Sequence, residues 1–245
     1  MTAWYVDWFN SSEYLTVYNH RNQNEADAFA ATIVKDIVLP ENCETLDLAC
    51  GAGRHAIAFA KYGHSVTAVD LSPKLLEVAR ESMLESDLKI DFVRDNILTF
   101  RSPKKFDLAL NVFTSFGYFD KDDDNFGIFR TAKTALRQNG YFVFDYFNVN
   151  YIRTNFVPYT RKFFGKTIVE QSRFIDGEKV GKTILIQSNL GLKAYRESVK
   201  LYGAEELCMQ LGKVGFTIVS LKGNYGGEPF NEVTSPRFIA ICKSV

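Results

Sequence analysis

A chain of 245 residues is long enough for one large α/β domain with a small additional subdomain, and we expect a single hydrophobic core. Its 29 basic residues balance its 29 acidic residues, which disfavours nucleic acid and an anionic membrane surface as partners. No apolar run approaches the roughly 20 residues that cross a bilayer, so no membrane segment is expected.

The cysteines give no sign of a metal site. Cys43, Cys50, Cys208 and Cys242 lie in apolar contexts without the spacing of metal ligands. The N-terminus lacks the basic segment and following apolar segment of a signal peptide. We therefore expect a cytoplasmic protein with reduced thiols and no bound metal.

The N-terminal part predicts a leading helical segment with an aromatic arm. Aromatic residues are dense over residues 4–18, and apolar residues recur with a helical period over 26–37. The plain interpretation is a helix that covers the edge of a sheet. The alternative is that Tyr14 and Tyr18 belong to a lid over a bound ligand, and His20 is a further candidate for facing that pocket.

Residues 45–70 have the order of a nucleotide-binding strand, helix and strand. An apolar strand ends in the turn Gly51-Ala52-Gly53, a helix is expected over 54–62, and a second apolar strand ends in Asp70. Glycines let backbone approach a ligand closely, and a new helix offers free N–H groups. A carboxylate at the end of the second strand can accept both hydroxyl protons of a ribose.

The pattern of strand and helix then repeats. Ser72-Pro73 predicts the start of a helix, and the helix that begins at the acidic residues 122–124 is expected to continue to Asn139-Gly140. Further strands are expected over 89–94, 106–112 and 141–146. Five strand and helix repeats predict a parallel sheet covered on both faces.

The pattern changes after Asn148. Alternation with a period of two from 166 to 201 predicts two or three antiparallel strands, with Asp176-Gly177 as a turn. We expect a core formed by 1–149 and 202–245 and an antiparallel β insert over 150–201. The core is expected to close with a helix over 203–212, strands over 216–221 and 237–242, and a loop over 224–230 that has the composition of a binding loop.

The glycine-rich turn alone leaves the ligand open. The run from Gly51 to Ala56 fits Gly-x-Gly-x-x-Ala, which is compatible with a nicotinamide or flavin dinucleotide. Three features favour a different cofactor: the acidic Asp47 inside the preceding strand, the polar pair Asp95-Asn96 after the third strand, and a terminal strand pair in place of a second mononucleotide half.

Together these features resemble the class I S-adenosylmethionine-dependent methyltransferases. The resemblance implies a doubly wound, mostly parallel seven-stranded sheet of the Rossmann-like type with an inserted antiparallel β subdomain. Ala49 replaces the first glycine of the family's first motif, and we expect a negative φ there. The runs from Ser115 to Phe119 and from Ser235 to Arg237 are similar to small-molecule methyltransferases, among them sugar-amine and glycine-type N-methyltransferases.

The resemblance also implies residue roles. Asp70 would bind the ribose hydroxyls, Leu71 would pack on the adenine, and Asp95 would face the adenine amino group. Arg54 would pair with a carboxylate of the cofactor or form a structural ion pair. The expected cofactor-binding residues are Tyr14, Tyr18, Asp47, Ala49, Gly51, Gly53, Arg54, Asp70, Leu71, Asp95, Asn96, Ile97, Asn111 and Phe113.

The activity implied is in-line transfer of a methyl group to a nitrogen or oxygen of a small-molecule acceptor, with S-adenosylhomocysteine as product. Proximity and orientation drive such a transfer, and a general base is optional. The candidate catalytic residues are Tyr118, Asp145 and Arg237. Asp145 would face the substrate or cap a strand end; Arg237 would bind a substrate carboxylate or, as we favour, an internal acid.

Several alternatives stay open at this point. One is an NAD(P)-dependent oxidoreductase, and another is a non-catalytic S-adenosylmethionine-binding protein. The acceptor and the choice between monomer and homodimer are not determined by the sequence. We expect the insert and the aromatic arm to form the roof of the acceptor pocket, His55 to pack on its helix, and His64 to lie at the surface.

Overall fold

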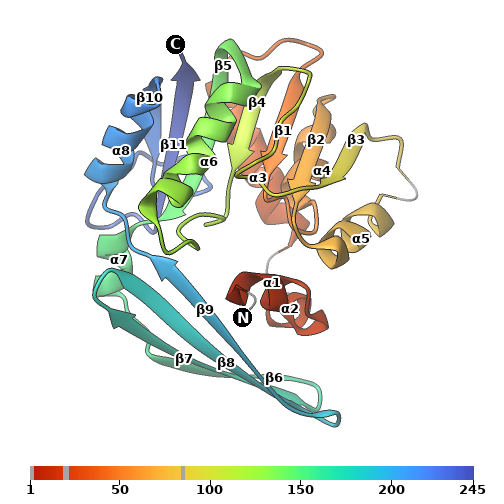
Figure 1. Cartoon of the computed structure of the whole chain (residues 1–245), viewed down its shortest axis with the longest axis vertical. Coiled ribbons are helices and arrows are strands. Elements are labelled where there is room, and N and C mark those ends of the chain that lie inside the picture. Colours follow the sequence, from red (N-terminus) through yellow and green to blue (C-terminus); the bar gives the residue numbers. More distant parts are fainter. Residues whose placement is uncertain (1–2, 19–21, 84–85) are drawn as a thin grey trace.

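A seven-stranded sheet, sheet A, organises the molecule (Figure 1). The computed structural model describes residues 3–18, 22–83 and 86–245, so the expectation for His20 lies outside the described residues. The strands of sheet A are β1 (Glu44–Leu48), β2 (Ser65–Asp70), β3 (Ile90–Arg94), β4 (Phe106–Asn111), β5 (Leu136–Phe147), β10 (Phe216–Lys222) and β11 (Arg237–Ser244).

The strand order in sheet A is β10-β11-β5-β4-β1-β2-β3. The five strands from β1 to β5 run parallel, and β11 lies antiparallel between β5 and β10. The chain moves outward from β1 in one direction and from β4 in the other, so the point of reversal lies between these two strands. Ligands of open α/β sheets bind at the carboxyl ends of the strands beside such a point.

Helices cover both faces of sheet A, as the alternating pattern predicted. One apolar cluster joins α3 (Gln23–Asp36), α4 (Arg54–Ala60) and α5 (Pro73–Glu81) to one face of the strands. The other cluster joins α6 (Asp122–Ala135) and α8 (Ala204–Lys213) to the opposite face. The doubly wound, mostly parallel sheet is therefore confirmed.

The boundary between α6 and β5 differs from the prediction. The helix ends at Ala135, and Asn139-Gly140 lies inside β5 instead of ending the helix. Asn139 has a φ of 63°, and a Cβ at Gly140 would lie 3.1 Å from the Asp107 carbonyl oxygen. The two residues thus form an irregularity in β5 where its pairing with β4 shifts register. In sequence, such an Asn-Gly pair looks the same as a signal that ends a helix.

The insert contains four antiparallel strands, one or two more than expected. Sheet B has the order β6 (Tyr159–Phe164), β7 (Thr167–Asp176), β8 (Lys179–Ser188) and β9 (Gly191–Lys200), and α7 (Val149–Thr154) connects it to β5. The short, exposed edge strand β6 has little alternation, which is why the sequence pattern missed it. Sheet B extends away from sheet A as a long ribbon (Figure 1).

Two short helices precede α3 and pack on sheet B. They are α1 (Trp4–Phe9) and α2 (Ser12–Val17), and we call them the N-terminal arm. Trp8 and Val17 of the arm form an apolar cluster with Val169, Ile184 and Ile186 of sheet B. The arm thus contacts the insert, whereas α3 covers sheet A. None of the helices in the described part of the chain is long and apolar enough to span a bilayer.

Candidate functional site

A cavity of about 850 Å³ lies between the carboxyl ends of the sheet A strands, the arm and one face of sheet B. We call the sheet A side the floor; it consists of Ala49 to Gly51, Asp70 and the turn Phe113-Thr114. We call the sheet B side the roof; it consists of Arg173, Lys182 and Glu197 with Tyr18 of the arm. The cavity therefore brings together segments that are far apart in the sequence.

The turn after β1 is built from residues with a left-handed backbone. Ala49, Gly51 and Gly53 have φ values of 64°, 57° and 78°. The expected negative φ at Ala49 is therefore wrong: the alanine adopts the conformation of the glycine that it replaces, at a cost of roughly 1 kcal/mol or more. A Cβ at Gly53 would lie 3.0 Å from the Ala79 Cβ and 3.1 Å from the Phe92 ring, so this glycine lets the start of α4 approach these two side chains closely.

Asp70 lies at the end of β2 and borders the cavity. Its Oδ2 accepts from the Gly51 N–H and its Oδ1 accepts from the Ser72 N–H, both at 2.8 Å. Burial raises the pKa of Asp70, and these two backbone N–H groups oppose the rise. A carboxylate has about four acceptor positions, and the Leu71 N–H also opposes the rise in pKa, so Asp70 keeps acceptor capacity for a further donor from the cavity.

Two buried acceptor groups near the floor have no partner in the described part of the structure. Both oxygens of Asp47 and the Oδ1 of Asn111 lack hydrogen bonds, although the Asn111 Nδ2 donates to the Leu48 carbonyl at 3.0 Å. Burial, assisted by the charge of Asp70, raises the pKa of Asp47 to about 7 against the weaker opposing effect of the Ala56 N–H and Arg54. Unpartnered buried acceptors cost free energy, and a cationic donor placed beside them would relieve that cost.

The turn after β4 is fixed by Asp145. Phe113 and Thr114 have φ values of 66° and 61°, which is uncommon for two consecutive residues other than glycine. The fully buried Asp145 accepts from the Phe113 N–H at 2.7 Å and from the Tyr225 hydroxyl at 2.8 Å. Its other oxygen accepts from the Arg237 Nε at 2.8 Å.

Arg237 completes this arrangement from β11. Its guanidinium also donates to the Thr114 Oγ1 at 2.9 Å and lies 5.8 Å from the centre of the Phe113 ring. Burial works against the charge of Arg237, but the Asp145 carboxylate outweighs burial and raises the pKa of the guanidinium. Of the two roles considered for Arg237, the structure shows the internal ion pair.

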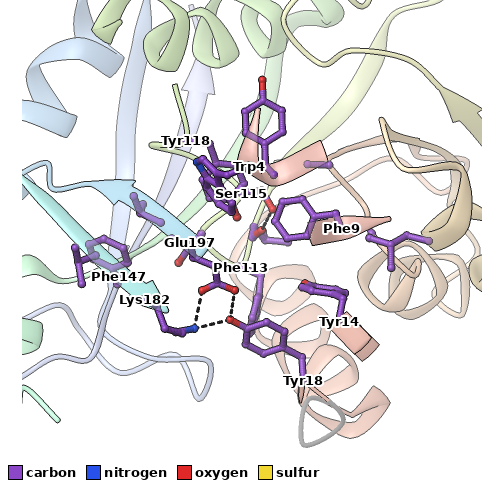
Figure 2. A pocket seen from close by; sticks show the side chains of 18 of the residues that line it. Trp4, Phe9, Tyr14, Tyr18, Phe113, Ser115, Tyr118, Phe147, Lys182 and Glu197 are labelled. Atoms are coloured by element: carbon purple, nitrogen blue, oxygen red, sulfur yellow. Dashed lines mark hydrogen bonds and ion pairs between the residues drawn. The ribbon is translucent and has the colours of Figure 1, made fainter. Parts of the chain in front are cut away.

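The roof is organised by Glu197 of β9. Its carboxylate accepts from the Trp8 Nε1 at 2.7 Å, the Tyr18 hydroxyl at 2.5 Å and the Lys182 Nζ at 2.6 Å. Lys182 also donates to the Tyr18 hydroxyl at 2.6 Å. Figure 2 shows the triangle between Lys182, Glu197 and Tyr18 beside the cavity. Burial disfavours the charge of Glu197, but Lys182 and the two arm donors outweigh it and lower its pKa.

Most of the residues predicted from the sequence border the cavity. These are Tyr14, Tyr18, Ala49, Gly51, Arg54, Asp70, Leu71, Asn96, Ile97, Phe113, Tyr118 and Arg237. The lining does not include Asp47, Gly53, Asp95, Asn111 or Asp145. Asp95 is turned toward its own loop, because its Oδ1 accepts from the Asn96 N–H at 2.7 Å.

Two other expectations concern single side chains. His64 is buried rather than exposed, because its Nδ1 forms a 2.8 Å hydrogen bond with the Thr45 Oγ1 and its ring packs near Phe59. Arg54 forms an ion pair with Glu25 at 3.6 Å, which is one of its two expected roles. Within residues 3–18, 22–83 and 86–245, no group of three or more His, Cys, Asp and Glu could bind a metal ion.

Among the residues of this region that the sequence did not single out are Arg173, Lys182, Glu197 and Tyr225. Tyr225 belongs to the loop singled out by its composition, so that signal was present. Lys182 and Glu197 are opposite charges on neighbouring alternating strands, but their meeting depends on the register of β8 and β9, which the sequence does not reveal.

Comparison with known proteins places the floor in a known domain. Residues 45–140 match a family model described as a methyltransferase domain. A ubiquinone biosynthesis O-methyltransferase of Xanthomonas campestris pv. campestris is 32% identical over 106 residues, which cover 42% of this chain and 42% of that protein. The aligned segment thus spans about two fifths of the length of that curated relative.

Solved structures match nearly the whole chain. An S-adenosylmethionine-dependent methyltransferase from Clostridium acetobutylicum superposes with a TM-score of 0.81 at 18% identity, over 94% of this chain and 95% of that one. The CcbJ methyltransferase from Streptomyces caelestis gives a TM-score of 0.82 at 16% identity, over 97% and 98%. The coverage includes sheet B, so these proteins share the inserted sheet as well as the core fold.

Proposed function

We propose that this chain belongs to the class I S-adenosylmethionine-dependent methyltransferase family, because of its matched domain and its fold. We further propose that it is an enzyme that methylates a nitrogen or oxygen of a small-molecule acceptor. The observation that carries the proposal is the position of Asp70. Its carboxylate borders the cavity, is oriented by the Gly51 and Ser72 N–H groups, and keeps free acceptor capacity for ribose hydroxyls.

The residues in and beside the floor fit the cofactor in three further ways. Asp47 and Asn111 do not line the cavity, but their unpartnered acceptors lie next to the turn after β1, where the positive charge of the ammonium of the methionine part would offset them. Leu71 and Ile97 offer apolar contacts to the adenine. The left-handed turn through Ala49 and Gly51 keeps backbone close to the ligand without a large side chain.

Bound S-adenosylmethionine supplies an electrophilic methyl group on a sulfonium. The protein contributes orientation, since aligning the acceptor with the methyl carbon can remove roughly 7 to 11 kcal/mol of the barrier. The aromatic rings of Phe9, Tyr14, Phe113 and Tyr118 line the cavity, exclude water and favour a cationic centre by cation–π attraction. A neutral amine acceptor would attack first and lose its proton afterwards, so no dedicated base is required.

We assign Asp145 and Arg237 as positioning residues and Tyr118 as a residue at the mouth of the acceptor site. Asp145 already accepts from three donors, which leaves it poorly suited to remove a proton from the acceptor. Its bonds fix Phe113 and Thr114 beside the point where the methyl group would be transferred. The roof, formed by the insert over 150–201 and the arm, would surround the acceptor.

The partner we propose is a small-molecule acceptor, and the location we propose is the cytoplasm. The free thiols of Cys43, Cys50, Cys208 and Cys242 support a reducing compartment. The choice between monomer and homodimer does not affect the proposed chemistry, because one chain contains both the floor and the roof.

Transfer of an isotopic label tests the activity. Purified protein would be incubated with methyl-labelled S-adenosylmethionine and pooled amines, hydroxy compounds and cell extract, and label would be followed into new compounds. We expect a labelled product with the wild-type protein and none with Asp70→Ala. Cofactor binding without transfer to any acceptor would support the non-catalytic alternative, and stabilisation by NAD alone would support the oxidoreductase.

A further inference from the structure

Three charged side chains lie in one row across sheet B. Arg173 of β7 pairs directly with Lys182 of β8, and Lys182 pairs with Glu197 of β9. Directly paired residues in a sheet project from the same face, and all three border the cavity. The roof therefore presents two cations and one anion to the acceptor side of the cavity.

The row is not electrically balanced. Lys182 is neutralised by Glu197 through their 2.6 Å ion pair. Arg173 has only uncharged acceptors: the Thr160 Oγ1 at 3.2 Å, the Val157 carbonyl at 3.4 Å and the Gln171 side-chain oxygen. In the described ranges, no carboxylate lies within 4.0 Å of its guanidinium, and its Nε makes no hydrogen bond.

The other cations of the cavity are already paired. Arg54 forms its ion pair with Glu25, and Arg237 forms its ion pair with Asp145. Burial lowers the pKa of Arg173 and outweighs the opposing effect of Tyr18 and Glu197, so the partly buried charge carries a desolvation cost, although an arginine stays protonated at neutral pH. A bound anion would offset that cost.

We propose that Arg173 binds a carboxylate of the methyl acceptor, so that the acceptor is a carboxylate-bearing amine or hydroxy compound. The inference rests on the proposed function and adds the substrate class to it. One unpaired guanidinium matches one negative charge, and its planar fork suits a planar carboxylate. A phosphate dianion would require a second unpaired cation, and Lys182 is engaged by Glu197.

The position of Arg173 also suits this role. It lies on β7, on the same sheet face as Lys182 and Glu197, and it interacts electrostatically with Tyr18. The floor offers the ribose and methionine contacts, so an acceptor anchored at the roof would reach toward the floor across the same cavity. The anchor would thus orient the attacking atom without contacting the cofactor.

Binding of simple probes tests the subsite without knowledge of the natural acceptor. The full-length protein would be saturated with S-adenosylhomocysteine and titrated by calorimetry with benzoate, benzamide and phenyl phosphate. We expect benzoate to bind about tenfold or more tightly than benzamide, as a charge-assisted hydrogen bond would produce. Equal binding of benzoate and benzamide would overturn the proposal, and tighter binding of phenyl phosphate than of benzoate would overturn the carboxylate assignment.

Variants link the preference to one side chain. Arg173→Gln is expected to abolish the preference for benzoate over benzamide, and Arg173→Lys to retain part of it. The matched control is Arg196→Gln, which removes an exposed guanidinium that lies 5.4 Å from the Phe174 ring and faces away from the cavity. A preference that survives in Arg173→Gln, or that is lost equally in Arg196→Gln, contradicts the subsite.

The same titrations separate this inference from the proposed function. Saturation with S-adenosylhomocysteine is measured first for each protein. If the cofactor product binds but benzoate and benzamide bind alike, the carboxylate subsite is wrong and the methyltransferase proposal stands. If wild-type protein does not bind S-adenosylhomocysteine, the proposed function itself is wrong.

Discussion

The floor and the roof of the cavity each depend on a buried carboxylate, and the two carboxylates are stabilised in opposite ways. Asp47 below the floor accepts no hydrogen bond of ordinary geometry in the described structure, and its pKa rises to about 7. Glu197 in the roof accepts from three donors, one of them a cation, and its pKa falls. Burial disfavours ionisation of both, so the difference comes from the donors around them.

This difference suggests what each region is built for. The roof satisfies its charged groups internally, apart from Arg173, and so connects the arm to sheet B before any ligand binds. Asp47 and Asn111 below the floor keep unsatisfied acceptors, and Asp70 in the floor keeps open acceptor capacity, which a cationic, hydroxyl-bearing cofactor would offset. Sites that bind a ligand commonly accept such a loss of stability.

The largest expected effect concerns the ion pair beside the floor. Asp145→Ala would leave the Arg237 guanidinium buried without its carboxylate and free the turn at Phe113 and Thr114. Breaking one side of a buried pair costs about 3 to 5 kcal/mol of unfolding free energy. Chemical denaturation would measure this loss, and the double variant Asp145→Ala with Arg237→Met should recover part of it. No recovery in the double variant would contradict the pairing.

A pH-dependent effect is expected from Asp47. Its folded pKa of about 7 lies above the ordinary value of 3.8, so its contribution to stability is present below pH 4 and is lost as the pH rises through 7. Asp47→Asn removes this loss and should stabilise the cofactor-free protein at pH 8 by on the order of 2 to 4 kcal/mol, with little change at pH 4.

Thermal unfolding of both proteins across this pH range would measure the effect. The same variant should bind S-adenosylhomocysteine more weakly, because the proposed partner of the ammonium is lost. A variant that is no more stable than the wild-type protein at pH 8 would contradict the unsatisfied state of Asp47.

A smaller effect is expected from Glu197→Gln in the roof. The amide keeps the size of the side chain but leaves Lys182 without its counter-ion, at a cost of about 1 to 3 kcal/mol for the contact between the arm and sheet B. The only tryptophans, Trp4 and Trp8, lie in the arm, so a red shift of their fluorescence would report its release. Unchanged emission and unchanged hydrogen exchange over 3–18 would contradict the proposed connection.

The pH dependence of the arm has the opposite sign from that of Asp47. The folded pKa of Glu197 is depressed, so its stabilising contribution is present above the ordinary value of 4.5 and is lost as the pH falls through the folded pKa. Between pH 8 and pH 5, the tryptophan emission should therefore stay constant. A transition in this window would show that Glu197 is not stabilised as the contacts indicate.

The smallest expected effect is at Ala49. Replacement by glycine relieves the positive φ, worth roughly 1 kcal/mol or more, while the freer unfolded chain offsets about 0.4 to 1 kcal/mol. We expect a melting temperature that is unchanged or higher by a few degrees and an unchanged affinity for S-adenosylhomocysteine. A clear decrease in melting temperature would show that the alanine methyl group stabilises the turn by packing.

The floor could largely be predicted from the sequence because its signals are local. Asp47, the glycine turn and Asp70 follow one another within two strands, and the parallel arrangement places the strand ends together. The left-handed φ of Ala49 was not predictable, because neighbouring hydrogen bonds from Ala49 and Cys50 to the Val69 carbonyl impose it.

The roof could not be predicted because its contacts depend on long-range register. Arg173, Lys182 and Glu197 are ordinary charged residues in alternating strands until the pairing of β7, β8 and β9 aligns them. The expectation that His64 lies at the surface was wrong for a similar reason, because its hydrogen-bond partner Thr45 comes from a distant part of the chain, in strand β1. Tyr225 reaches Asp145 only through the fold of the loop before β11.

The most direct test of the account is calorimetric binding of S-adenosylhomocysteine to the wild-type protein, Asp70→Asn and Asp70→Ala. The asparagine variant keeps the size of the side chain, which separates the loss of charge from damage to the turn. The account predicts saturable binding of one molecule per chain to the wild-type protein and affinity reduced about tenfold or more in both variants. Absence of binding to the wild-type protein, or undiminished affinity in both variants, would contradict it.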